Sequence, residues 1–328
     1  MTLNVHLLNE YNPQITEYLQ TQLEPDVRLT VSETTVLDGD IHILIAGRPD
    51  RDVFVANKDL QALVIPWTGI PPETRELLAD FPHVAAHNLH HNATPVAEMT
   101  VALLLAAAKN VIPFDRALRN GDWTMRYRKP APSLLLKGKT VLILGYGKIG
   151  RRIARICSSL GMNVIAIKRK AIMDETDRFA KEIHTPQKLH ELLPRAQFLI
   201  VALPLTQETN GLIGESELDL LPTDSVLVNI GRGLIVNEEA LYKALKDGNL
   251  GAAGLDVWYN YPASEESRTS TYPANFPFWE LDNVVLSPHR AGLTNDIDYL
   301  RMDHLAVLLN AAARNEQVPN RVNLNHGY

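Results

Sequence analysis

The segment 145–150, Gly-Tyr-Gly-Lys-Ile-Gly, constrains the fold of this chain more than any other stretch. It follows an apolar run of strand length, 140–144, and opens a stretch with helical spacing that Gly161 closes. In such a turn the first glycine permits the sharp bend, the second lets a ligand approach the backbone, and the third lets the helix pack on the strand. The free N–H groups at the helix start suit phosphate. The segment therefore predicts a dinucleotide-binding unit with Gly145, Gly147, Lys148, Ile149 and Gly150 at the pyrophosphate.

A second expected strand, 163–167, ends in three basic residues, Lys168, Arg169 and Lys170. Sites specific for NAD place an acidic residue at this point, on the ribose 2′-hydroxyl. A basic cluster instead attracts and binds a 2′-phosphate. The sequence therefore favours NADP(H) over NAD(H), with Lys168 and Arg169 as contacts; the alternative is a solvated basic strand end with no role in selectivity.

Strand-like and helical segments alternate along almost the whole chain, which predicts an α/β protein with parallel sheets. The length of 328 residues suggests two domains. Strands are expected at 3–8, 27–31, 41–46, 63–65, 84–86, 140–144, 163–167, 198–202, 226–229, 252–257 and 284–286. Helices are expected at 13–22, 73–80, 148–160, 238–248 and 296–314. Thr94 as the N-cap and Pro95 at the first helical position introduce a buried helix that joins the two domains.

Composition narrows the functional classes. The formal charge of -6 gives no electrostatic reason to expect nucleic acid or an anionic membrane as a partner. The longest apolar run, 99–108, is too short for a membrane span, and no secretory signal pattern opens the chain. A single cysteine, Cys157, excludes an internal disulfide and a multi-cysteine metal site. We expect a cytoplasmic protein without a metal, and Cys157 as a small buried residue of its helix.

Four further motifs carry a resemblance to a known family. They are LPLTQETNGLI at 203–213, VNIGRG at 228–233, GLDV at 254–257 and SPHRAG at 287–292. In this order and spacing they resemble the D-isomer-specific 2-hydroxyacid dehydrogenases, and among them most the glyoxylate/hydroxypyruvate reductases. The segment 88–98 is similar to the family's entry into its interdomain helix.

The resemblance implies two Rossmann-like domains with the active site in the cleft between them. The cofactor domain, 98–289, would be inserted into a flavodoxin-like substrate domain, 1–97 and 290–328. It also implies an oxidoreductase that moves hydride between NAD(P)H and a small 2-oxo acid or D-2-hydroxy acid, and we expect a homodimer.

Two residues match the family's catalytic positions. Arg232 would orient the 2-oxo acid, since a planar, permanently charged guanidinium can hold a carboxylate while it polarises a carbonyl. His289 would act as acid and base, since imidazole titrates near neutral pH. The resemblance further implies a substrate loop at Thr68, Gly69 and Ile70, and cofactor contacts from Pro204, Ile230 and Asp256.

The chain departs from the family at the partner of the histidine. Most members carry a glutamate five residues after the strand aspartate, and here that position is Tyr261. Formate dehydrogenases carry glutamine there, so hydride transfer does not require the glutamate. Tyr261 could hydrogen-bond to His289, or Glu265 or Glu266 in the following loop could replace the missing carboxylate. The sequence does not decide between these three.

Three other residues near the expected site leave alternatives open. Trp67 stands where the family has a small residue, and either reshapes the substrate pocket toward short substrates or packs away from it. His90 and His91 have no metal-ligand spacing, which favours a surface or packing role.

Two rival functions remain. A nucleotide-sensing regulator with the same fold and little turnover is favoured by Tyr261, but the retention of Arg232 and His289 argues against it. Oxidation of formate or phosphite within the same fold is the weaker of the two hypotheses, because Arg290 follows the histidine.

Overall fold

The computed structural model describes residues 2–8, 11–32, 41–170 and 175–324. The chain divides into two compact units, unit 1 (residues 1–92 and 293–328) and unit 2 (residues 93–292). The sequence predicts boundaries at 97/98 and 289/290 instead. The first boundary shifts because helix α4 (Ala93–Ala108) packs along its length in unit 2, against strands and a helix of that unit.

Unit 1 holds a five-stranded parallel sheet in the order β2-β1-β3-β4-β5, the order of flavodoxin-like folds. Its strands are β1 (Leu3–Leu8), β2 (Val27–Ser32), β3 (Ile43–Ile45), β4 (Ala62–Ile65) and β5 (Ala85–Asn88). Its helices are α1 (Pro13–Gln22), α2 (Arg51–Ala56), α3 (Pro72–Ala79) and α11 (Ile297–Ala313).

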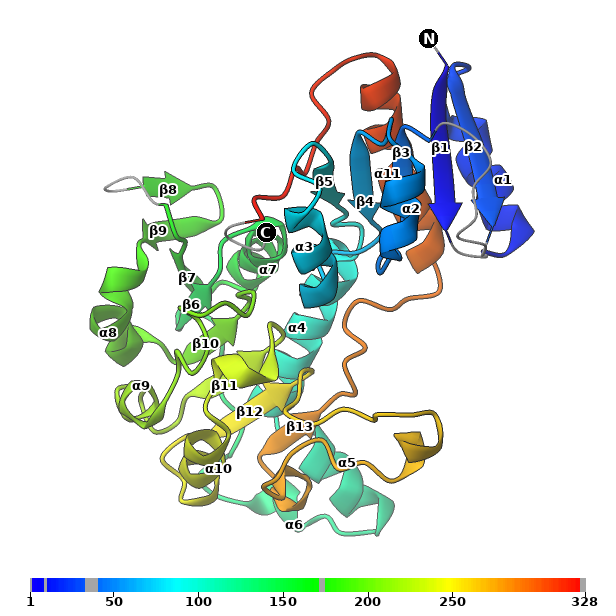
Figure 1. Ribbon diagram of the computed structural model, residues 1–328. Helices are drawn as coiled ribbons and strands as arrows, with labels where there is room; N and C mark the ends of the chain where they lie inside the picture. The colour runs from blue at the N-terminus through cyan, green and yellow to red at the C-terminus, as the bar shows by residue number, and fades with distance from the viewer. Residues whose placement is uncertain (1, 9–10, 33–40, 171–174, 325–328) are drawn as a thin grey trace. The chain divides into compact units, whose positions relative to one another are not determined.

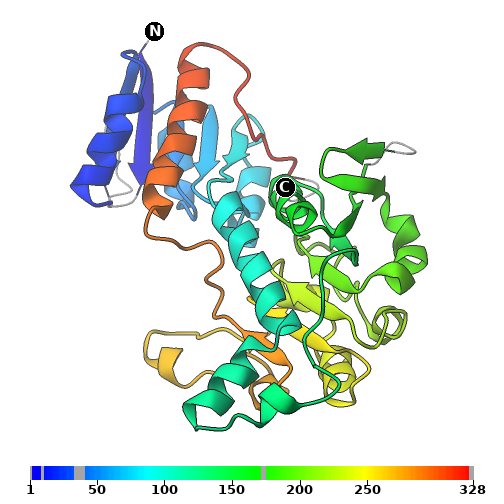
Figure 2. The ribbon, with the colours of Figure 1, turned by 180° about the vertical axis from the view of Figure 1, so that it is seen from behind.

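Alternation of side chains along each strand gives unit 1 two apolar layers. Ile43 and Ile45 lie in a core with α1 and α11, while Leu44 between them lies in a second core with α2 and α3. The two pairs of helices therefore cover opposite faces of the sheet (Figures 1 and 2). The last helix, which the sequence places after the second unit, returns to unit 1 as α11.

Unit 2 holds an eight-stranded sheet in the order β13-β12-β11-β10-β6-β7-β9-β8. The strands are β6 (Thr140–Leu144), β7 (Asn163–Ile167), β8 (Glu175–Asp177), β9 (Ala180–His184), β10 (Phe198–Val201), β11 (Val226–Asn229), β12 (Ala252–Leu255) and β13 (Val284–Leu286). The helices are α4, α5 (Val111–Arg119), α6 (Thr124–Tyr127), α7 (Lys148–Ser159), α8 (Leu189–Leu192), α9 (Glu215–Asp219) and α10 (Glu238–Lys246). Without β8 and β13, the order is that of the dinucleotide-binding fold, with helices on both faces.

The same alternation builds the two cores of unit 2. Val141 and Ile143 of β6 pack with α4 and α7, while Leu142 and Leu144 pack with α8, α9 and α10. Contact between α4 and the sheet is close enough that a Cβ on Gly254 would lie 2.9 Å from Leu103. Cys157 is fully buried in α7, as the sequence predicts.

Two local expectations are wrong. Thr94 is not the N-cap of α4, because the helix begins one residue earlier, and its hydroxyl accepts a hydrogen bond from Arg152 instead. The hairpin of β8 and β9 was not expected, because its residues, Glu-Thr-Asp and Ala-Lys-Glu-Ile-His, do not form an apolar strand pattern.

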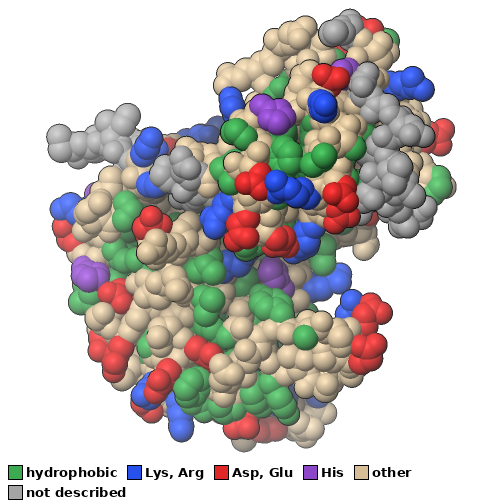
Figure 3. Space-filling model, viewed as in Figure 1, with side chains coloured by type: hydrophobic (Ala, Val, Ile, Leu, Met, Phe, Trp, Pro, Cys, Tyr) green, Lys and Arg blue, Asp and Glu red, His purple; other side chains and the backbone are tan. Residues whose placement is uncertain are grey.

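Among the residues described, no single helix is long and apolar enough to cross a membrane, and only the bent pair of α4 and α5 passes such a test together. Basic and acidic side chains are interspersed on the face seen in Figure 3.

Candidate active site

The expected site residues of unit 2 all follow the carboxyl ends of its parallel strands. Because parallel neighbours end at the same edge of a sheet, the loops after β6, β7, β10, β11, β12 and β13 lie along one edge. The strand order reverses between β6 and β10, which is where ligands bind in open α/β sheets. Gly145 and Lys168 lie on one side of this point, and Arg232, Asp256 and His289 on the other.

The three glycines of the segment 145–150 each have a different structural role. Gly145 has a φ of +101°, and a Cβ there would lie 2.5 Å from the carbonyl oxygen of Ala202. A Cβ on Gly150 would lie 1.9 Å from the carbonyl oxygen of Gly145, so this glycine brings α7 onto the turn. A Cβ on Gly147, at the start of α7, would meet no atom within 4 Å, so its surface is open to a ligand. The turn therefore fits a dinucleotide pyrophosphate at the start of α7.

The basic strand end lies beside this turn. The backbone N–H of Lys168 donates to the carbonyl of His184, which ties the end of β7 to β9. Lys168 is partly buried, whereas Arg169 and Lys170 are exposed. Two cationic side chains are thus exposed at the carboxyl end of the strand next to the glycine turn.

Arg232 is held by a turn that Asn229 braces. The side chain of Asn229, which is buried, accepts from the N–H of Gly231 at 3.0 Å and donates to the carbonyl of Arg232 at 3.0 Å. The guanidinium is exposed and donates to the carbonyl of Gly231 at 2.7 Å, which uses one of its five N–H donors. The remaining donors suit an anionic ligand.

His289 has a left-handed backbone conformation, with a φ of 56°. Such a conformation is uncommon outside glycine and is found at functional sites. The buried carboxylate of Asp256 accepts from Ser287 Oγ at 2.5 Å, and from the backbone N–H groups of Arg290 at 2.9 Å and Ala291 at 3.1 Å. Asp256 thus fixes the loop on both sides of the histidine.

Tyr261 is the side chain that pairs with His289. Its Oη lies 3.0 Å from His289 Nδ1, and the two ring centroids are 5.6 Å apart. The same oxygen accepts from the backbone N–H of Trp258 at 3.1 Å. The two carboxylates considered as substitutes are engaged elsewhere, since Glu265 pairs with Arg268 and a hydrogen bond with Ser264 lowers the pKa of Glu266.

The neighbours of His289 favour its neutral form. Packing around the ring lowers the pKa of His289 below its ordinary value of 6.5, and the positive charge of Arg232 lowers it further, while Asp256 acts in the opposite direction. Burial raises the pKa of the Tyr261 phenol, so this group keeps its proton at neutral pH.

In unit 1 the expected substrate loop follows β4. The carbonyl of Pro66 accepts from Arg301, that of Trp67 from the N–H of Leu89, and that of Thr68 from Asn88. These contacts hold the carbonyl groups of the loop against the scaffold. The N–H groups of Thr68, Gly69 and Ile70 donate no hydrogen bond that we observe within the described chain, which leaves them for an anion.

The structure also places Trp67 and His91, two of the residues of unit 1 whose roles the sequence left open. The ring of Trp67 packs on Gly47, where a Cβ would lie 1.8 Å from it, and beneath the guanidinium of Arg48 at 5.9 Å. Trp67 is therefore a packing residue of its unit. His91 is buried, packs edge-on against the ring of His304, and burial lowers its pKa to about 3.

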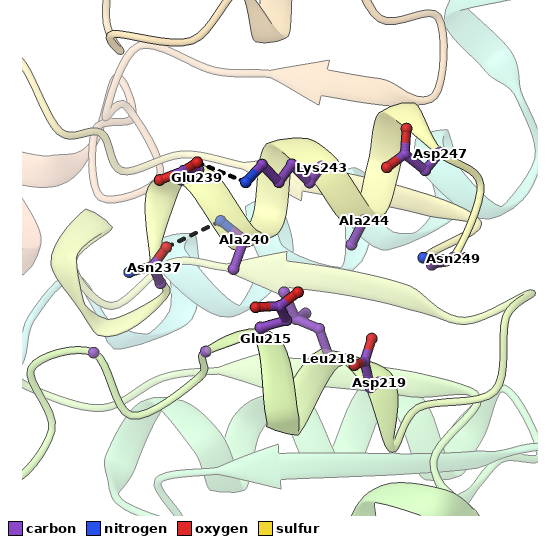
Figure 4. A pocket seen from close by; sticks show the side chains of 12 residues that line it. Glu215, Leu218, Asp219, Asn237, Glu239, Ala240, Lys243, Ala244, Asp247 and Asn249 are labelled. Atoms are coloured by element: carbon purple, nitrogen blue, oxygen red, sulfur yellow. Dashed lines mark hydrogen bonds and ion pairs between the residues drawn. The ribbon is translucent and has the colours of Figure 1, made fainter.

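A groove of about 390 Å³ lies elsewhere in unit 2, between α9 and α10 (Figure 4). Glu215, Asp219, Glu239 and Asp247 line it together with Lys243, which pairs with Glu239 at 2.6 Å. It contains neither the glycine turn nor Arg232 or His289. Among the residues that the structure describes, no group of three or more His, Cys, Asp or Glu side chains could hold a metal.

Comparison with known proteins identifies the family of this chain. The sequence model for the D-isomer specific 2-hydroxyacid dehydrogenase, NAD binding domain, matches residues 101–291, more than half of the chain. The chain belongs to this family.

Curated relatives include glyoxylate reductases. That of Aeropyrum pernix is 40% identical over 69% of this chain and 65% of its own length. The D-3-phosphoglycerate dehydrogenase of Methanocaldococcus jannaschii is 28% identical over 88% of this chain, and the match spans 52% of its own length. The match therefore spans about two thirds of the length of the first relative and about half of the length of the second.

Among solved structures, a family member from Xanthobacter autotrophicus Py2 in complex with NADPH and MES has a TM-score of 0.80, with 24% identity and all of both chains covered. An NADPH-dependent glyoxylate/hydroxypyruvate reductase of Sinorhizobium meliloti in complex with NADP and malonate has a TM-score of 0.70 and 24% identity, over all of this chain and 98% of that one. These likenesses confirm the expected α/β fold.

Sequence reasoning did not identify the residues that hold the site together. Ser287 and Trp258 support the histidine loop, since the indole N–H of Trp258 donates to the carbonyl of Ser287 at 2.7 Å. Ile230, expected at the cofactor, is buried in the core that it shares with Ala291. The motifs carry no separate signal for the hydrogen bonds that support the histidine loop.

Proposed function

We propose that this chain catalyses reversible hydride transfer between NADP(H) and carbon 2 of a small 2-oxo acid, giving the D-2-hydroxy acid. One observation carries the proposal. A permanently charged Arg232 follows β11 and a titratable His289 follows β13, in the sheet that bears the glycine turn. Asp256, which follows the strand between them, holds the loop of His289 in an unusual backbone conformation. The names of the relatives, glyoxylate reductases above all, agree with this chemistry.

In the proposed reaction the bound dinucleotide supplies or accepts the hydride. Arg232 binds the substrate carboxylate and polarises its carbonyl oxygen. His289 donates a proton from Nε2 to that oxygen during reduction and takes it back during oxidation. The N–H groups of Thr68, Gly69 and Ile70 bind the substrate carboxylate.

We propose NADP(H) as the preferred dinucleotide because Lys168 and Arg169 lie where a 2′-phosphate would bind. Pro204 and Asp256 are proposed contacts of its nicotinamide half. The NADP complexes of the structural neighbours support this preference.

We further propose a cytoplasmic homodimer. Exposed apolar side chains on and near α5, namely Val111, Ile112, Leu118 and Trp123, support an interface with a second copy.

The test is a panel of 2-oxo acids that includes glyoxylate and hydroxypyruvate, assayed by loss of NADPH or NADH absorbance. We expect turnover with NADPH on a short 2-oxo acid, and its loss in His289→Gln. Cofactor binding without turnover on any substrate would instead support a nucleotide-sensing regulator.

A further inference from the structure

Tyr261 contacts His289, the acid and base of the proposed function, so the inference about Tyr261 rests on that function. Its oxygen joins two loops: it meets His289 Nδ1 at 3.0 Å and the backbone N–H of Trp258 at 3.1 Å. The phenol is therefore held from a second side and does not depend on the histidine for its position.

Counting donors and acceptors shows what this oxygen can offer the histidine. A phenol has one proton to donate and two lone pairs. The N–H of Trp258 occupies one lone pair. One lone pair and one proton remain, so Tyr261 can accept from Nδ1 when the ring is protonated there, or donate to Nδ1 when it is bare.

A carboxylate in the same place behaves differently. An ionised carboxylate only accepts, so it favours a proton on Nδ1 in every state of the ring. Its charge also stabilises the imidazolium, as an opposite charge at such a distance raises a histidine pKa by ~1–3. A neutral phenol stabilises the imidazolium less.

We propose that Tyr261 is a positioning residue that holds His289 in both of its protonation states through one oxygen, and that it thereby confines reduction to lower pH than a carboxylate at position 261 would. Reduction needs the imidazolium as proton donor, so its rate falls as pH rises through the titration of His289. Oxidation needs the neutral ring, so it gains over the same range.

The surroundings of His289 within unit 2 support the proposal. The charged groups that face it are Arg232, from the loop after β11, and Asp256, from the end of β12; Arg290 follows it on its own loop. His289 is exposed as a residue, and the partial shielding of its ring together with the charge of Arg232 lowers its pKa and outweighs Asp256. Asp256 is also occupied by three hydrogen bonds to the loop rather than to the ring.

The experiment compares the pH dependence of kcat/KM for reduction in the native enzyme with that in three variants. Tyr261→Glu and Tyr261→Gln form a matched pair, because they differ in charge but not in length. In the native enzyme we expect kcat/KM for reduction to decrease as the pH rises, with a midpoint below pH ~6.5. The midpoint of the same decrease should lie at least about one pH unit higher in Tyr261→Glu than in Tyr261→Gln. Tyr261→Phe should lower kcat about five- to tenfold, with native NADPH affinity as the control for folding.

A second measurement does not depend on activity. NMR titration of the His289 ring, assigned by the signals lost in His289→Gln, reports the pKa and which nitrogen carries the proton. In the native protein we expect the neutral ring to carry its proton on Nδ1, which donates to the Tyr261 oxygen and leaves Nε2 bare to act as the base. We expect Tyr261→Phe to lower the pKa because the imidazolium loses an acceptor. A native pKa at or above ~7, or a ring titration that Tyr261→Phe leaves unchanged, would overturn the proposal. Failure of the proposed function appears separately, as absence of turnover on every 2-oxo acid.

Discussion

The conformation of His289 is maintained by hydrogen bonds that its own side chain does not make. A left-handed backbone at a non-glycine residue costs about 1–3 kcal/mol. Asp256 accepts three hydrogen bonds from the surrounding loop, and bonds to a charged group contribute about 1.5–3 kcal/mol each. The aspartate therefore offsets strain of this size and fixes the backbone of the loop on both sides of the histidine.

Arg232 is expected to act on the substrate rather than on the cofactor. Replacing it with alanine should lower kcat/KM for the 2-oxo acid by about 10²–10³-fold, because both the carboxylate contact and the polarisation of the carbonyl are lost. Arg232→Lys keeps the positive charge but lacks the planar guanidinium, so its kcat/KM should lie between those of the native enzyme and Arg232→Ala. The measurements are steady-state kinetics and NADPH binding by fluorescence. An equal loss of NADPH affinity in Arg232→Ala would show that the residue belongs to the cofactor site.

Lys168 is expected to select between the two dinucleotides. Lys168→Asp replaces attraction for a 2′-phosphate with repulsion, so the ratio of kcat/KM with NADPH to that with NADH should fall about tenfold or more. Lys139→Asp is the matched control, since it makes the same charge change at an exposed residue before the amino end of β6, away from the carboxyl edge. A native enzyme that already prefers NADH by about tenfold would contradict the role given to the basic strand end.

At the scale of elements, two glycines at the start of α7 have different expected roles: Gly147 as a ligand contact and Gly150 as a packing contact. Gly147→Ala adds a methyl group to open space, so the protein should keep its Tm and lose NADPH affinity. Gly150→Ala puts a Cβ 1.9 Å from the carbonyl oxygen of Gly145, so it should cost about 1–3 kcal/mol or more and lower the Tm by several degrees. Calorimetry and NADPH titration of the two variants check this. Equal Tm losses in both would mean that Gly147 also serves packing.

The sequence predicts elements well where apolar residues face a core. Strands β6, β7 and β11 have the expected bounds, because both faces of their sheet are covered by helices and all but one residue of each strand is apolar. The polar hairpin of β8 and β9 at the edge of the sheet carries no such signal. The motifs predicted Arg232, Asp256 and His289 as site residues, and the structure places them after the consecutive strands β11, β12 and β13. The partner of the histidine was undecidable, because only the path of the loop after β12 decides whether Tyr261, Glu265 or Glu266 reaches the ring.

At the scale of the whole molecule, the two units differ in how the chain forms them. Unit 2 is one continuous stretch of sequence, whereas unit 1 is assembled from residues on both sides of it. Unit 2 has two cores of its own, one on each face of its sheet. Helix α11, which completes a core of unit 1, comes from the far end of the chain. Unit 1 therefore depends on both segments, while unit 2 depends on neither.

An excised unit 2, residues 93–292, is accordingly expected to fold alone. It retains the glycine turn, Lys168, Arg232 and His289, so it should bind NADPH with near-native affinity. It lacks the N–H groups of Thr68, Gly69 and Ile70, so reduction of a 2-oxo acid should fall by at least about 10²-fold, the loss that follows removal of a single preorganised donor. A circular dichroism melt, NADPH titration and steady-state kinetics measure the three properties, with Gly147→Ala in the same fragment as the control for specific binding. A fragment that melts cooperatively but turns over like the whole chain would show that the loop of unit 1 has no part in binding the substrate.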